Sequence, residues 1–216
     1  MSADAGDYIL RHYDEALRLH GDTIQGAHWP NEADLLKRYQ VMLEVIKSPL
    51  PSCPVFCDLA CGTGGFYGYL KQMYDGNFSY IGVDRSRLAI RLARQKFPAV
   101  PFHQMDVSAS GVDLSPLSCD FLICNGLFTV KWNLSQDAMW RFLEETITRV
   151  WPVVRCGIAF NVMSKAVDWE RDDLFHVPMD HVAALLHRLA GRNIVLRADY
   201  GLYEYTAYAW KRDVSR

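Results

Sequence analysis

The alternation of strand-like and helical segments after residue 54 is the feature that most limits the fold of this chain. Apolar runs rich in β-branched and aromatic residues alternate with segments of helical periodicity, which separate the first three runs and the last two. The runs are Val55–Leu59, Tyr80–Asp84, Val100–Met105, Asp120–Cys124 and Gly157–Val162. Strands joined by helices need right-handed crossovers, so the pattern predicts a doubly wound α/β fold with a mostly parallel sheet.

The C-terminal part of the chain departs from this alternation. Two further strand-like runs, Asn193–Asp199 and Tyr203–Trp210, are joined by only Tyr200–Leu202. So short a connection leaves no room for a crossover helix, and the two strands must pair antiparallel. We expect a seven-stranded, mostly parallel sheet with an antiparallel last strand, placed at the edge of the sheet.

Two helical segments precede the sheet. They cover 7–19 and 31–47, and Asn31 is a suitable N-cap for the second. Prolines at 49, 51 and 54 then separate them from the first strand. We expect an N-terminal helical lid over 1–52 and an α/β domain over 53–216, together forming one structural domain.

Composition restricts the class of function. The 216 residues are 50% apolar, carry a net charge of −2 and contain no long run of one charge, which argues against a nucleic-acid or membrane-surface protein. The apolar stretches are shorter than the roughly 20 residues of a membrane span, and the start MSADAGDY has no signal-peptide pattern. We expect a cytoplasmic protein that is a monomer or a homodimer.

The cysteines do not predict a metal site. Cys53, Cys57 and Cys61 are spaced four apart, but this segment reads as a strand, along which successive side chains alternate between faces. The sequence contains no compact C-x-x-C pair. We therefore expect reduced, mostly buried thiols and no bound metal.

A glycine-containing turn follows the first strand. It contains Gly62 and Gly64, and glycines there allow positive φ and close approach of the backbone to a ligand. The next strand ends in Asp84, where a carboxylate can accept hydrogen bonds from both hydroxyls of a ribose. A dinucleotide fingerprint needs a third glycine where this chain has Tyr67. The two features together indicate an adenosine-containing ligand other than NAD.

These motifs resemble those of the class I S-adenosylmethionine (SAM)-dependent methyltransferases over about residues 53–211. Asp58, Gly62 and Gly64 resemble the first motif, with Ala60 in place of its usual first glycine, and Asp84 matches the ribose-binding acid. Asp106 resembles the acid that accepts a hydrogen bond from the adenine amino group, and 119–128 resembles the fourth motif, facing the methionine half. The resemblance implies SAM as cofactor and a Rossmann-like class I fold. The cofactor-binding residues that it implies are Trp29, Arg38, Asp58, Ala60, Gly62, Gly64, Asp84, Arg85, Asp106, Val107 and Asn125.

Residues before the first strand suggest how the ligand is covered. In small-molecule members of this class, an N-terminal arginine pairs with the cofactor carboxylate, and Arg38 is our candidate because a guanidinium binds a carboxylate bidentately. Trp29, Tyr8 and Tyr13 are candidates for an aromatic lid near the sulfonium, which cation–π attraction favours. Alternatively, Arg38 lies on a solvated helix face and the aromatic residues belong to the core. The resemblance also implies that Asp58 lies near the amino group of the ligand. The alternative role of Asp58 is to fix the turn by accepting backbone N–H bonds.

Candidates for the catalytic residues are His176, Asn125 and Tyr203. A histidine has an unperturbed pKa near neutrality, which suits a general base, although His176 could equally be a surface or capping residue. Tyr203 is close to Tyr205 in the last strand-like run and could simply pack there.

The hypothesis that follows is methyl transfer from SAM to an oxygen or nitrogen of a small metabolite, of the sugar or natural-product type. Two alternatives remain open. The protein could instead cyclise SAM to azetidine-2-carboxylate and methylthioadenosine, or bind SAM without catalysis, because a fold alone does not establish activity.

Overall fold

The computed structural model describes residues 5–211, and its centre is a sheet of eight strands. Seven of them form a continuous path in the order β3-β2-β1-β4-β5-β8-β7. The strands are β1 Val55–Leu59, β2 Ser79–Asp84, β3 Phe102–Gln104, β4 Cys119–Phe128, β5 Val154–Ser164, β6 His176–Val177, β7 Ile194–Arg197 and β8 Glu204–Trp210. The predicted doubly wound α/β fold is confirmed.

Strands β1 to β5 pair in parallel, and β8 pairs antiparallel with both β5 and β7. The last strand is therefore reversed, as expected, but its predicted place at the edge of the sheet is wrong. It lies between β5 and β7, because its hairpin partner β7 takes the edge. The predicted number of seven strands omits β6, a two-residue strand that pairs with β5 beside this path.

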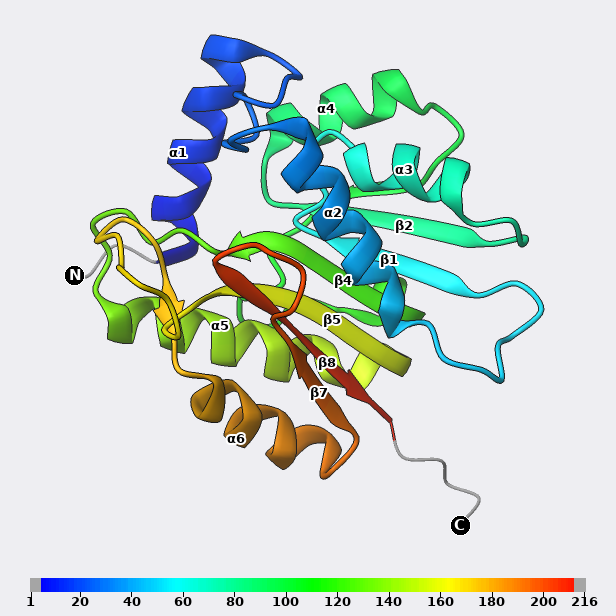
Figure 1. Cartoon of the computed structure of the whole chain (residues 1–216). Helices are drawn as coiled ribbons and strands as arrows, with labels where there is room; N and C mark the ends of the chain where they lie inside the picture. Colours follow the sequence, from blue (N-terminus) through cyan, green and yellow to red (C-terminus); the bar gives the residue numbers. More distant parts are fainter. Residues whose placement is uncertain (1–4, 212–216) are drawn as a thin grey trace.

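Helices cover both faces of the sheet (Figure 1). The helices are α1 Ala5–His20, α2 Glu32–Met42, α3 Gly65–Met73, α4 Arg87–Lys96, α5 Gln136–Val150 and α6 Met179–Ala190, with 3₁₀ turns η1 Leu43–Val45, η2 Ser115–Leu117 and η3 Trp151–Val153. One apolar core joins α5 and α6 to the sheet, and a second joins α2, α3 and α4 to the other face. Asn31 caps α2 and Ser135 caps α5, each accepting a backbone N–H bond.

The two N-terminal helices are attached differently. The end of α2 and the 3₁₀ turn η1 bind the far end of the sheet through backbone carbonyls. Val41 accepts from the Tyr208 hydroxyl and Val45 from the Trp210 indole, both at 2.7 Å. Helix α1 instead stands beside the carboxyl end of β4 (Figure 1) and contacts α4 and α5. The division of the chain into 1–52 and 53–216 stays a prediction. Residues 1–4 and 212–216 of these two parts lie outside the described residues.

Candidate functional site

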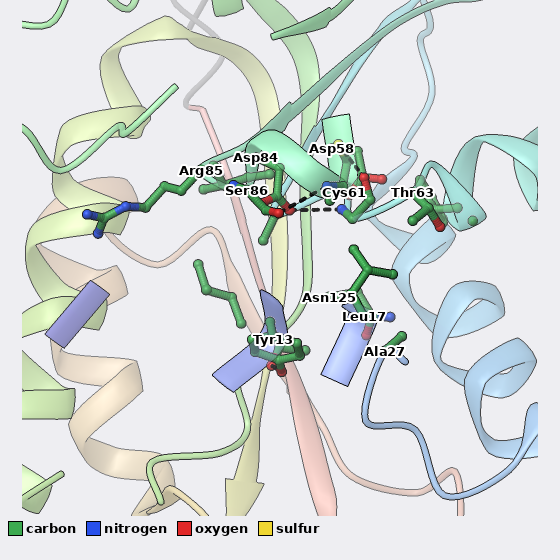
Figure 2. Close-up of a pocket in the computed structure, with 18 of the residues that line it drawn as sticks. Tyr13, Leu17, Ala27, Asp58, Cys61, Thr63, Asp84, Arg85, Ser86 and Asn125 are labelled. Carbon is green, nitrogen blue, oxygen red and sulfur yellow. Dashed lines mark hydrogen bonds between the residues drawn. The ribbon is translucent and has the colours of Figure 1, made fainter. Parts of the chain in front are cut away.

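A cavity of about 640 Å³ lies at the carboxyl ends of the neighbouring strands β1 and β4, where the strand order changes direction, beneath α1 and α2. Ligands of open α/β sheets bind at such a switch point, outside the carboxyl ends of the strands. The turn after β1 and the ends of β2 and β4 form one wall of this cavity, and α1, α2 and the segment between them form the facing wall. Figure 2 shows Asp58 and Asp84 on the first wall and Tyr13, Leu17 and Ala27 opposite.

The turn after β1 exposes its backbone to the cavity. Ala60 and Gly62 both have positive φ, 61° and 53°, and a Cβ added to Gly62 would project into open space. Because a non-glycine residue rarely adopts this conformation, the strained Ala60 fits the usual glycine position only through its small side chain. Gly64 has another role: it caps α3 at φ 82° and packs against Phe97 and Phe102 instead of lining the cavity.

Asp84 points back at this turn, and its carboxylate joins the ends of β1 and β2. One oxygen accepts the Gly62 N–H at 2.9 Å, and the other accepts the Ser86 N–H at 2.7 Å. Burial raises the pKa of Asp84, while the two backbone bonds oppose that rise. The carboxylate thus stands at the cavity wall, and its contact with a ribose stays a prediction.

Asp58 is buried at the bottom of the cavity near the turn. It accepts a hydrogen bond from the Tyr80 hydroxyl at 2.6 Å, where the alternative interpretation expected backbone N–H groups. Burial raises the pKa of Asp58 to about 7, against the lowering effect of the Tyr80 bond. A cationic ligand group in the cavity would therefore find a carboxyl group that ionises near neutral pH.

The residues after β2 and β3 form the end of the cavity nearest α5. Arg85 bridges Asp106 at 3.0 Å and Asp7 of α1 at 2.5 Å. Asp106 also accepts two hydrogen bonds from Ser108, and Val107 lines the cavity beside it. Asp106 is the predicted adenine-binding residue, and Arg85 and Val107 are predicted cofactor-binding residues; the structure brings the three together, and their contacts with a cofactor stay predictions.

The end of β4 forms the opposite corner. Asn125 lines the cavity, and its Oδ1 is buried without a hydrogen-bond partner among the described residues. Next to it, Gly126 turns the chain at φ 88°, and the Trp29 indole lies so close that a Cβ on Gly126 would meet it at 2.7 Å. The Tyr13 hydroxyl donates to the Gly126 carbonyl at 3.4 Å. Trp29 and Tyr13 thus close this corner, whereas Tyr8 does not line the cavity; a contact of these rings with a sulfonium stays a prediction.

Arg38 is buried, which differs from a solvated helix face, and its main partner is Glu204. Its Nε and Nη2 lie 2.8 and 2.7 Å from a carboxylate oxygen of Glu204, and its guanidinium lies 4.7 Å from the centre of the Trp29 ring. Arg38 does not line the cavity, but its buried Nη1 has no partner among the described residues. The contact with a cofactor carboxylate stays a prediction, limited to this one nitrogen.

Two of the three catalytic candidates lie elsewhere. His176 is buried in β6: its Nδ1 lies 2.6 Å from the Ser164 carbonyl, and its Nε2 accepts the Arg171 N–H at 3.2 Å. Both ring nitrogens are engaged by backbone, and the ring does not line the cavity, so the structure corrects the prediction of a general base. Tyr203 is 57% exposed and packs against Trp169, also outside the cavity.

The sequence interpretation gave no individual role to Asn161, Glu204 or Tyr39. Asn161 donates to Glu204 and accepts the Gly126 N–H, while Tyr39 lines the cavity with its hydroxyl against Gly65. Asn161 and Glu204 are polar residues within otherwise apolar strand runs, and this was the available signal.

Comparisons with known proteins agree with this geometry. Residues 56–150 match the family model of a methyltransferase domain. A Mycobacterium tuberculosis protein named as a methyltransferase, Rv1506c, is 29% identical over 152 residues, which are 69% of this chain and 88% of that protein. The SAM-bound magnesium protoporphyrin IX methyltransferase from Synechocystis is similar in structure (TM-score 0.61, 16% identity, 98% and 99% of the two chains covered). The TehB-like SAM-dependent methyltransferase from Corynebacterium glutamicum is also similar in structure, with a TM-score of 0.55 and 14% identity. That match covers 97% of this chain and 98% of the other.

The cavity fits the cofactor of these proteins. Open space above Gly62 leaves room for a ligand against the backbone, and the unpartnered Asn125 Oδ1 can accept a hydrogen bond from a ligand group. The buried Asp58 and the partly buried Asp84 both line the cavity, where their carboxyl groups can bind the ammonium group and the ribose of a ligand. No helix within residues 5–211 has the length and apolar character to cross a membrane.

Proposed function

We propose that this protein, which is a class I SAM-dependent methyltransferase, transfers the methyl group to an oxygen or nitrogen of a small metabolite. The observation that carries the choice of atom is the unpartnered, buried Oδ1 of Asn125 at the cavity wall. A buried acceptor without a partner is costly, by about 1–3 kcal/mol, so a ligand with a hydrogen to donate is favoured there. Hydroxyl and amine acceptors have such a hydrogen.

The residues of the chain divide the work of this reaction. SAM, when bound, supplies a methyl group on a positively charged sulfur, which is already activated for displacement. Asp84 and Asp58 hold the ligand, while Trp29 and Tyr13 exclude water from the Asn125 corner. Asn125 orients the acceptor through its O–H or N–H, and alignment of this kind is the main source of rate in such a transfer.

The lining of the cavity also bears on the acceptor. No histidine is among its described lining residues. This favours an acceptor that reacts as a neutral amine, or as a hydroxyl that ionises readily. The volume of about 640 Å³ is within the range of roughly 300–1,000 Å³ typical of small-molecule sites, and the cover formed by α1 and α2 favours a metabolite over a macromolecule.

The test is turnover of labelled SAM with a metabolite extract, followed by mass spectrometry. The proposal expects S-adenosylhomocysteine (SAH) together with an acceptor heavier by one methylene unit, with the methyl on oxygen or nitrogen. Methylthioadenosine as the nucleoside product would instead show cyclisation, and SAH without a methylated acceptor, or methylation on carbon, would contradict the proposal.

A variant ties the activity to the site. Asn125→Leu should abolish turnover while SAH still binds, because the orienting oxygen is lost but the ribose and glycine contacts remain. Asn193→Leu, an exposed position before β7, is the matched control and should retain activity.

A further inference from the structure

A chain of buried polar contacts joins α2 to the end of β4 through the last strand. Arg38, Glu204 and Asn161 are 8%, 1% and 0% exposed. Glu204 accepts from Arg38 with one oxygen and from Asn161 Nδ2, at 2.9 Å, with the other. Separating the partners of a buried ion pair leaves an uncompensated charge, which is strongly unfavourable. This cost holds Arg38 and Glu204 in the observed arrangement.

Both ends of the chain of contacts meet at the same corner of the cavity. At one end, Asn161 Oδ1 accepts the Gly126 N–H at 2.8 Å. At the other end, the Arg38 guanidinium lies over the Trp29 ring, and Trp29 itself lies against Gly126. The contacts form a closed ring: Trp29, Arg38, Glu204, Asn161, Gly126 and back to Trp29. The ring also fixes the orientation of the Asn161 amide, because only one orientation lets it donate to Glu204 and accept from Gly126.

We propose that Glu204 and Asn161 are positioning residues for methyl transfer, which hold Trp29 and the Asn125–Gly126 corner as one rigid wall around the reacting methyl group. This inference rests on the proposed function. Neither residue lines the cavity, so neither touches the ligand, and each acts through Gly126 or Trp29. A displacement of about 1 Å at a reacting centre can lower a rate by roughly 100-fold. A ring of contacts that does not touch the ligand can therefore still change the rate of methyl transfer.

The test is Glu204→Gln, which keeps the shape of the side chain. An amide has one acceptor oxygen where the carboxylate has two, so its NH₂ group must face either Arg38 or Asn161, and the ring opens. We expect kcat on the acceptor identified above to fall about tenfold or more, with the KM for SAM changed less than threefold. We also expect a change of at least threefold in the ratio of the SAM and SAH dissociation constants, because only SAM has the methyl group that this wall faces.

Asp120→Asn is the matched control. Asp120 is a 5% exposed carboxylate at the opposite ends of the strands, where it accepts from Arg155 Nε and the Val55 N–H, both at 2.8 Å. The same change of carboxyl to amide should lower stability there and leave kcat and the SAM-to-SAH ratio within twofold of wild type.

Three results would overturn the inference. One is a folded Glu204→Gln variant with kcat and ratio both within twofold of wild type, and another is equal losses in the two variants. If Glu204→Gln does not fold, Asn161→Ala opens the ring by removing the contacts with both Gly126 and Glu204 while the Arg38–Glu204 pair stays, and an unchanged ratio there is the third. The ratio is measured without an acceptor, so absence of any methylated product counts against the proposed function and leaves this measurement decisive for the ring.

Discussion

At the scale of single residues, the predicted binding of SAM depends most on the contact between Asp84 and Gly62. Replacing Asp84 with Asn should weaken SAM binding by about 10- to 100-fold, because hydrogen bonds to a charged group contribute about 1.5–3 kcal/mol. Isothermal titration measures this. Asp113→Asn is the control: Asp113 makes the same kind of turn with Ser115 but is exposed and remote from the cavity. Equal affinities in wild type and Asp84→Asn would contradict the assignment.

Asp58 predicts a dependence of binding on pH. Its pKa of about 7 means that the ligand-free carboxyl is mostly protonated at pH 6 and mostly ionised at pH 8. The cationic ammonium of SAH favours the ionised form, so affinity should rise about tenfold from pH 6 to pH 8. The sign for ligand-free stability is opposite: the folded pKa lies above the unfolded value of 3.8, so the contribution of Asp58 is complete below pH 4 and is lost as pH rises through about 7.

Titrations at pH 6, 7 and 8 check this prediction, with Asp58→Asn as the control. The variant should lose most of the slope, and any remaining slope reports Asp84, whose pKa is also raised. A slope as steep as that of wild type would show that Asp58 does not face the ligand ammonium.

The sequence revealed those parts of the site whose signal is local. Asp84 and Gly62 could be found because Asp84 ends one recognisable strand and Gly62 lies in the turn after another. Arg38 and Glu204 are 166 positions apart, and nothing in either segment encodes their pairing. The prediction for His176 failed for the same reason: the pairing of β6 with β5 places its ring against the Ser164 carbonyl, and that pairing cannot be read from a loop sequence.

At the scale of elements, a similar distinction separates what could and could not be predicted. The hairpin of β7 and β8 follows from a connection too short for a helix. The position of β8 between β5 and β7 depends on which strand of the hairpin pairs with β5, and contacts between distant segments, such as that of the Tyr208 hydroxyl with Val41, accompany the arrangement. The two-residue β6 has no periodicity to detect.

Helix α1 should be the mobile part of the cavity wall before the cofactor binds. Its ion pair with the sheet, Asp7 to Arg85, is partly exposed, and such pairs contribute about 0–1 kcal/mol. Its residues Ile9, Tyr13 and Leu17 line the cavity, so a ligand completes their packing. We expect the amides of α1 to exchange at least tenfold faster than those of α5 without ligand and to slow markedly with SAH.

Hydrogen exchange followed by mass spectrometry measures this difference. Helix α6 contributes no residue to the cavity lining and is the internal reference, whose exchange should not respond to SAH. If α1 were already as protected as α5 in the ligand-free protein, the cavity would be closed before binding, and a different entry route would be needed.

At the scale of the whole molecule, the six free cysteines report how completely the two apolar cores exclude solvent. Only Cys53 is exposed and Cys156 is partly buried, whereas the other four are buried. Burial raises the pKa of the Cys61 and Cys124 thiols, which suppresses the reactive thiolate further. A thiol reagent such as dithionitrobenzoate should therefore find one fast group in the native protein, one slow group, and six in denaturant. Cys53→Ser should remove the fast phase alone, and three or more fast groups in the native protein would mean that the layers covering the sheet open far more readily than this packing allows.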